Sequence, residues 1–216
     1  MYCEQLPLWS AKHVTGLSKT LAGVAIWFAT AFPVAAQQPI PAQAKVEAFH
    51  AILLNVMKQA KSRSVQERFK LLRPTVETSF DFKLMIALAS GKHWRAASDA
   101  GKQDLKRAFS RFSVATYADR FSGFSGQSFK TLSVDQGPRR TKLIRTQITR
   151  PDDSPIPLTY VTRRREGEWR IVDVLVDDGI SELAVRRSEY RNVLRDSGIS
   201  GLIRLLNSKT NKLLRP

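Results

Sequence analysis

One stretch in the C-terminal third of the chain, residues 168–181, limits the fold most strongly. Its apolar, β-branched run from Ile171 to Val176 stops at Asp177-Asp178-Gly179. This composition and length predict a buried or half-buried strand closed by a turn. Ser181 then stands where a helix N-cap is expected, and Glu182 follows in the first turn. The stretch therefore predicts a strand that leads directly into a helix.

The part of the chain before the strands, about 44–120, has helical periodicity. Apolar residues from Ala44 to Lys61 recur at spacings of three and four, which predicts an amphipathic helix. A second helix is predicted from Val65 to Leu72, where Pro74 is expected to stop it. Two further helices are predicted, one nearly continuously apolar from Phe82 to Ala89 and one from Ser98 to Tyr117.

Four strands are predicted between about 128 and 177, because short apolar alternations there are separated by turn residues. The two-residue connection Glu166-Gly167 favours a hairpin. Helices are predicted again over about 182–214. This order predicts an α+β fold with a four-stranded antiparallel sheet, one face of which is covered by helices. The predicted strands are 129–134, 142–149, 156–165 and the run that starts at Trp169.

The first 36 residues are typical of a secretory signal peptide. Two lysines precede a short apolar segment, residues 21–32, and the small residues Val34-Ala35-Ala36 suit a cleavage site. The segment is too short to span a bilayer comfortably, although an uncleaved anchor is the alternative. Cys3 is the chain's single cysteine, so the mature part, 37–216, has no disulfide and depends on its core as a single domain.

The chain is strongly basic, with a formal net charge of +16. The predicted signal peptide removes two lysines and one glutamate, which leaves about +15. Because an exported protein rarely meets nucleic acid, we expect no nucleic-acid partner. Anionic membrane surfaces and acidic faces of other proteins are the expected partners, and a basic surface that only maintains solubility is the alternative.

Catalytic, metal and cofactor motifs are not found in the mature sequence. Its two histidines, His50 and His93, have no ligand spacing around them, and no cysteine accompanies them. There is no phosphate-binding glycine loop with its lysine, and no Gly-x-Ser-x-Gly elbow. We therefore predict no metal, no cofactor and no enzymatic activity.

Asp173 is the one carboxylate that needs an explanation, because it lies inside the apolar run. A buried carboxylate is costly unless it is hydrogen-bonded or paired. Asp173 would serve as a general base if it faced a pocket. The alternative is that it points away from the core and pairs with an arginine of the neighbouring strand, among residues 163–165.

Several short motifs, in order, resemble one family. The chain resembles the MlaC family, also called the toluene-tolerance (Ttg-type) family, and its strongly basic mature part is similar to the hopanoid-associated HpnM branch. The match spans nearly all of residues 46–206. The motifs that carry it are Phe80-Asp-Phe82, Gly91-Lys-His-Trp94, the helix from Gln103 to Tyr117, Trp169-Arg-Ile-Val-Asp173, Asp178-Gly-Ile-Ser181, Arg187-Ser-Glu-Tyr190 and Gly198-Ile-Ser-Gly-Leu-Ile203 with Leu206.

The resemblance implies a curved, NTF2-like sheet packed against N- and C-terminal helices with an apolar cavity between them. It implies a periplasmic shuttle that carries phospholipid or a hopanoid-type lipid between the inner and outer membranes, with no cofactor. An inner-membrane transport complex and an outer-membrane component are the implied partners.

Under this interpretation, large apolar residues of both helices and strands form the cavity wall, and basic residues contact the head group or the membrane. For each wall residue, ordinary core packing is the alternative. The predicted wall residues are Phe109, Phe112, Tyr117, Phe121, Phe124, Leu158, Tyr160, Trp169 and Val174; the predicted head-group residues are Arg139, Arg140, Arg163 and Arg164, with Arg165 beside them.

Two other functions compete with a lipid carrier. The first is a periplasmic enzyme with a cone-shaped pocket and Asp173 as its acid–base group, which requires Asp173 to face the cavity. The second is a basic adaptor that binds membranes or a partner and has a filled core. The sequence offers no second convergent polar group for the enzyme, and its many large apolar residues favour a cavity over the adaptor.

Overall fold

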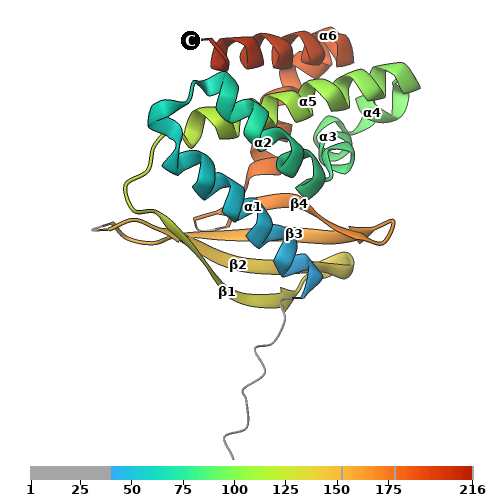
Figure 1. The fold of residues 1–216 in the computed structure, drawn as a ribbon. Coiled ribbons are helices and arrows are strands. Elements are labelled where there is room, and N and C mark those ends of the chain that lie inside the picture. Colours follow the sequence, from blue (N-terminus) through green and yellow to red (C-terminus); the bar gives the residue numbers. More distant parts are fainter. Residues whose placement is uncertain (1–39, 152, 178, 216) are drawn as a thin grey trace, which may run out of the picture. The chain divides into compact units, whose positions relative to one another are not determined.

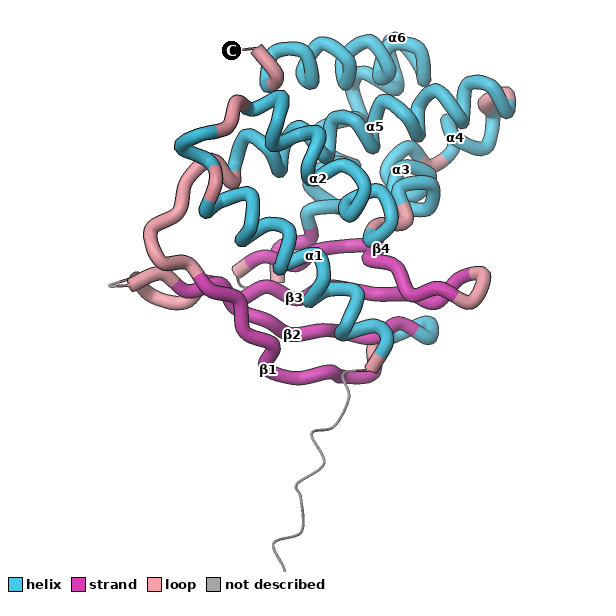
Figure 2. The backbone as a smooth tube through the Cα atoms, in the orientation of Figure 1, coloured by secondary structure: helices cyan, strands magenta, loops and turns pink. Residues whose placement is uncertain are grey.

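The computed structural model describes residues 40–151, 153–177 and 179–215, so the predicted signal peptide, 1–36, lies outside the described residues. Figures 1 and 2 show a layer of helices above a curved antiparallel sheet. The helices are α1 (Pro41–Lys58), the short η1 (Ala60–Ser62), α2 (Val65–Ser79), α3 (Phe82–Ser90), α4 (Lys92–Ala96), α5 (Asp99–Arg120), the short η2 (Pro138–Arg140) and α6 (Glu182–Leu213). The strands are β1 (Ser128–Gln136), β2 (Thr141–Thr149), β3 (Ile156–Arg165), β4 (Glu168–Val176) and β5 (Ile180–Ser181).

Helix α2 begins at a complete capping box. The Ser64 hydroxyl accepts a hydrogen bond from the Glu67 N–H, and the Glu67 carboxylate accepts one from the Ser64 N–H. The helix then continues past Pro74 to Ser79, so the prediction that Pro74 stops it was wrong. Pro74 is on the exposed face, where water can satisfy the carbonyl that loses its N–H partner. Packing of the buried residues on the opposite face keeps the helix intact.

The sheet has five antiparallel strands in the order β1-β2-β3-β4-β5, rather than the four predicted. The added strand β5 is only two residues long and pairs Ile180 with Val176 of β4. It was missed because it follows the turn at residue 179 without an apolar run of its own. Register shifts place an extra residue in β1 after Thr131 and in β4 beside Thr162 of β3. Such bulges bend a strand and increase its twist, which accounts for the curvature seen in Figure 2.

Helix α1 lies across the concave face of the sheet and contacts all four long strands. Helices α2, α3, α5 and α6 form the rest of the layer above it (Figure 1). The two predicted C-terminal helices both lie within α6, which has a kink between them at Gly198. The φ of 59° at this position suits glycine. Within the described ranges, no helix has the length and apolar character needed to cross a bilayer.

Aromatic side chains join the two layers. The Phe49 ring on α1 makes edge contacts with Phe80 and Tyr117, each with ring centroids 5.1 Å apart, and with Tyr160 of β3 at 6.2 Å. Phe80 itself bridges to Ile171 of β4, and the next residue's N–H donates to the Ile171 carbonyl at 2.9 Å. These contacts fix the helical layer above β3 and β4, as expected from edge-to-face aromatic geometry.

Asp173 connects the sheet to helix α6. Its carboxylate accepts a hydrogen bond from the Ser181 hydroxyl at 2.6 Å and another from the Leu183 N–H at 3.0 Å. The same Ser181 oxygen accepts from the Ala184 N–H at 2.9 Å, which makes Ser181 the predicted N-cap. The carboxylate therefore accepts hydrogen bonds from donors that would otherwise be free at the start of α6. Its negative charge also interacts favourably with the positive end of the helix dipole. It does not pair with an arginine of β3.

We expect Asp173→Ala to lower the free energy of unfolding by about 2 kcal/mol, because two half-buried donors at the start of α6 lose their acceptor. Urea unfolding followed by circular dichroism measures this change. Asp119→Ala is the matched control: Asp119 is exposed on α5, and we expect a change below about 0.5 kcal/mol. Equal losses in both variants would contradict the capping role.

Candidate functional site

A cavity of about 350 Å³ lies between the helical layer and the sheet. Its walls come from the C-terminal half of α5, the start of α6, α3 and the inner faces of β2, β3 and β4. Fourteen of its nineteen lining side chains are aliphatic or aromatic, and the volume of the cavity is within the range of small-ligand sites. The apolar lining residues are Leu53, Phe80, Phe82, Met85, Phe109, Tyr117, Phe121, Ile148, Ile156, Leu158, Tyr160, Val174, Val176 and Leu183.

The charged and small polar side chains in the lining all come from two helices. They are Ser113, Thr116 and Arg120 on α5 and Glu182 and Arg186 on α6. Two lining residues are exposed, Arg120 at the end of α5 and Ile156 at the start of β3. The cavity therefore opens to solvent beside these two residues. An amphipathic molecule would therefore find apolar contacts inside and charged groups at the opening.

The inner wall is held in place by a buried polar pair. The His50 Nε2 atom on α1 lies 3.0 Å from the Tyr160 hydroxyl, and the His50 ring stacks on Phe129 of β1 with centroids 4.1 Å apart. The His50 side chain is almost fully buried, and this burial lowers its pKa from 6.5 to about 4. Burial also raises the pKa of the Tyr160 and Tyr117 hydroxyls well above their usual range. All three side chains are neutral near pH 7, as an apolar wall requires.

Six of the nine predicted wall residues line this cavity: Phe109, Tyr117, Phe121, Leu158, Tyr160 and Val174. The other three do not. Phe112 faces a neighbouring groove, and Phe124 lies 37% exposed below the Lys58 amine. Trp169 lies at the opposite end of β4, where the Lys142 amine is 5.8 Å from its ring.

The predicted head-group arginines lie away from the cavity opening. Arg139 and Arg140 form the turn between β1 and β2, and Arg163 and Arg164 lie at the end of β3 that meets the Glu166-Gly167 hairpin. None of them lines the cavity. The basic residues at the opening are instead Arg120 and Arg186, which no sequence motif distinguished among the many lysines and arginines of this chain. The structure therefore does not bring the four predicted arginines to this opening, and their contact with a head group or a membrane stays a prediction.

Asp173 is not among the residues that line the cavity. Both of its carboxylate oxygens accept hydrogen bonds from the first turn of α6. The geometry that a general base in this cavity would need is therefore not present at Asp173. Across residues 40–215, apart from the two positions without a description, no group of three or more His, Cys, Asp or Glu side chains is arranged to hold a metal ion.

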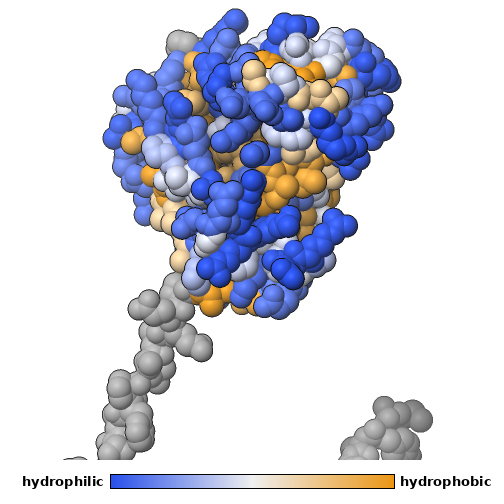
Figure 3. Space-filling model, turned by 90° about the vertical axis from the view of Figure 1, so that its right-hand side faces the viewer, coloured by the Kyte–Doolittle hydropathy of each residue, from blue (hydrophilic) through white to orange (hydrophobic). Residues whose placement is uncertain are grey.

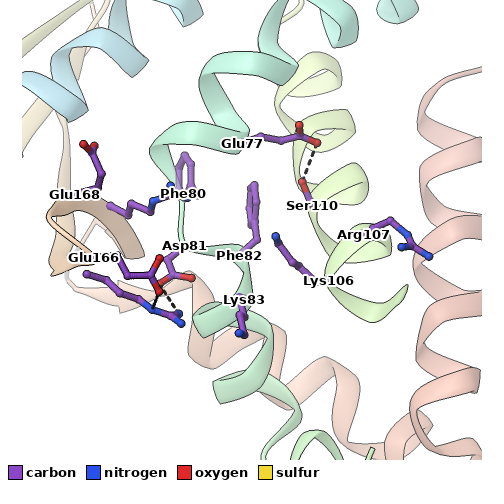
Figure 4. Close-up of a pocket in the computed structure, with 12 residues that line it drawn as sticks. Glu77, Phe80, Asp81, Phe82, Lys83, Lys106, Arg107, Ser110, Glu166 and Glu168 are labelled. Carbon is purple, nitrogen blue, oxygen red and sulfur yellow. Dashed lines mark hydrogen bonds and ion pairs between the residues drawn. The ribbon is translucent and has the colours of Figure 1, made fainter. Parts of the chain in front are cut away.

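A second hollow of about 430 Å³ lies on the other side of Phe80 and Phe82, whose stacked rings separate it from the apolar cavity. Figure 4 shows Glu77 reaching Ser110 on α5, and Asp81 beside Glu166. This charged pocket contains five basic and four acidic side chains, and each acidic one has a basic partner. Figure 3 shows the right-hand face of Figure 1, where hydrophobic residues lie between hydrophilic groups.

Helices on one face of a curved sheet, with an apolar cavity between the layers, define a small ligand-binding domain of the α+β class. The family model described as "MlaC protein" matches residues 47–208, three quarters of the chain. The chain belongs to the MlaC family. The resemblance seen in the sequence motifs is thereby confirmed at the level of the family.

A solved structure supports the same fold. The chain is similar to a phospholipid-binding protein from Ralstonia solanacearum whose structure was determined in complex with a phospholipid. The two share 20% sequence identity with a TM-score of 0.69, over 81% of this chain and 99% of the other. The predicted α+β fold with a curved antiparallel sheet is confirmed, with five strands in place of four.

The buried His50 predicts a pH-dependent stability. The pKa of His50 is about 4 when folded and 6.5 when unfolded. The contribution of His50 to the free energy of unfolding is therefore fully present above pH 6.5. It falls by on the order of 3 kcal/mol as the pH drops from 6.5 through 4. Urea unfolding at a series of pH values should show that His50→Gln removes this part of the acid sensitivity. His93→Gln, the control, should leave it unchanged; a parallel loss in both variants would contradict the assignment.

Proposed function

We propose that this protein is a periplasmic lipid carrier that holds the acyl chains of a phospholipid in the apolar cavity. The observation that carries the proposal is the cavity itself: fourteen apolar side chains from both layers surround it, and its five other lining side chains all come from α5 and α6. The family membership and the phospholipid in the Ralstonia structure support the same cargo.

The energetics of such a cavity suit an acyl chain. Each methylene removed from water contributes about 0.8 kcal/mol, so roughly ten buried methylenes supply on the order of 8 kcal/mol. In the bilayer the acyl chains are also shielded from water and gain the same free energy. The cavity therefore replaces the apolar environment that the lipid leaves. The Tyr117 and Tyr160 side chains add wide apolar surfaces, and the Tyr160 hydroxyl already has its partner in His50.

The proposal extends to transport between the inner and outer membranes. The chain would leave the cytoplasm through its predicted signal peptide, receive lipid from an inner-membrane transport complex or an outer-membrane component, and deliver it to the other. The basic surface suits contact with anionic membranes or acidic partner faces. A hopanoid-type lipid is the alternative cargo that the sequence resemblance implies, and mass spectrometry of an organic extract distinguishes it from a phospholipid.

We expect Leu158→Trp to reduce the lipid that co-purifies with the protein at least several-fold. Leu158 is half-buried and lines the cavity, so a larger ring would occupy the space of an acyl chain. The measurement is mass spectrometry of an organic extract, quantified against the amount of protein. Near-stoichiometric phospholipid in the wild type is the expected starting point.

Leu132→Trp is the matched control, because Leu132 lies on β1 with 52% of its surface exposed and outside the cavity. It should retain lipid at the wild-type level. An empty wild-type extract that stays empty after incubation with labelled vesicles would overturn the carrier function. Equal lipid in Leu158→Trp and the wild type would place the lipid elsewhere.

A further inference from the structure

A strongly basic groove adjoins the opening of the apolar cavity. Its volume is about 540 Å³, and it is formed by the C-terminal half of α5, Arg186 on α6 and the C-terminal end of α6. The groove and the cavity share Thr116, Arg120 and Arg186 in their linings, so they are adjacent. Its basic side chains are Arg120, Arg186, Lys209, Lys212 and Arg215, and its single acidic side chain is Asp119.

Among the residues that the structure describes, most of these cations have no carboxylate partner. Arg186 forms an ion pair with Glu189 at 3.1 Å, but no other described carboxylate pairs with any basic residue of the groove. Arg186 and Lys209 instead lie on the Phe112 ring, at 5.1 and 5.9 Å from its centroid. Like charges gathered in one concave site raise the local potential, so the groove attracts anions.

The groove is also held in a fixed shape. The Gln66 side-chain amide on α2 donates to the Leu214 carbonyl at 2.6 Å, and the Arg111 guanidinium on α5 donates to the Asn211 side chain at 3.3 Å. These bonds tie the end of α6 to two other helices. A cation in the last helical turn also stabilises the helix dipole, but this effect requires only one of the cations present.

We propose that this groove binds the phosphate of the lipid head group and selects phospholipids whose head group carries a net negative charge. The inference rests on the proposed lipid-carrier function and adds the class of cargo to it. With acyl chains in the cavity, the phosphate of the same molecule would lie at the opening, where Arg120 and Arg186 belong to both sites. Lysine and arginine donors are the groups that bind phosphate in proteins.

The charge balance distinguishes between head groups. A choline or ethanolamine head group brings a cation of its own beside five basic side chains. Asp119 is the one acidic side chain in the groove lining that would attract that cation, with Glu182 in the adjoining cavity and Glu189, already paired with Arg186, nearby. A glycerol head group brings no cation, so its phosphate gains the attraction without repulsion. Inorganic phosphate has the same chemistry but none of the apolar contact that the cavity provides.

The test offers the purified protein mixed vesicles with equal amounts of phosphatidylglycerol and phosphatidylcholine that have identical acyl chains. Mass spectrometry of the re-isolated protein gives the ratio of the two lipids. We expect about a threefold to tenfold enrichment of phosphatidylglycerol, the range that a few exposed charge pairs supply. In the groove variant, Lys209→Gln, Lys212→Gln and Arg215→Gln together, we expect the ratio to fall toward one.

The matched control removes three other cations, Arg140→Gln, Arg163→Gln and Arg164→Gln, and keeps the same net charge as the groove variant. It should retain the wild-type ratio. A ratio near one in the wild type, or an equal shift in both variants, would overturn the head-group inference while leaving the carrier function standing. Absence of both lipids from every protein would overturn the carrier function. Loss of the enrichment in millimolar inorganic phosphate would assign the groove to free anions instead of the head group.

Discussion

An apolar cavity in a domain of this size survives only if the layers around it are prevented from closing. Protein interiors are normally packed as densely as organic crystals. A closed, empty cavity of about 350 Å³ would cost on the order of 8 kcal/mol, which is comparable with the whole stability of a typical domain. The cavity wall must therefore be held by contacts with residues behind and beside it. The edge contacts of Phe49 and the junction of Phe80 with Ile171 hold one side of it.

The junction at Asp173 holds the other side. This carboxylate comes from a strand whose inner face lines the cavity, and it satisfies the first turn of the helix that forms the cavity opening. The hydrogen bonds thus set the distance between sheet and helix where a ligand would enter. This half-buried carboxylate is stabilised because the start of the helix supplies the Ser181 hydroxyl, the Leu183 N–H and a favourable dipole. Asp173 thus makes a structural contact between β4 and α6. The residues of β4 that line the cavity, Val174 and Val176, are uncharged.

The charged pocket and the basic groove are each lined by five basic side chains, but they differ in how many acidic side chains accompany them. In the charged pocket beyond Phe80 and Phe82, four carboxylates accompany the cations and each is paired. In the basic groove beside the cavity, Asp119 is the single acidic residue. Balanced charges largely cancel at a short distance, whereas an excess of one sign attracts a counter-charge. The groove that adjoins the apolar cavity is the one with the excess.

Local features of the sequence determined the secondary structure and the fold class. Caps such as Ser98 and Ser181, and alternation along β2 to β4, predict elements because they depend on near neighbours in the chain. The family motifs are likewise local. Pro74 misled the prediction because its effect depends on whether the ring faces water or the core. Tertiary structure alone decided which aromatic residues face a cavity: Phe109 does, and Phe112 on the same helix does not. It alone brought Arg120 beside the end of α6, some ninety residues away, since such a juxtaposition depends on the packing of whole helices and no spacing in the sequence records it.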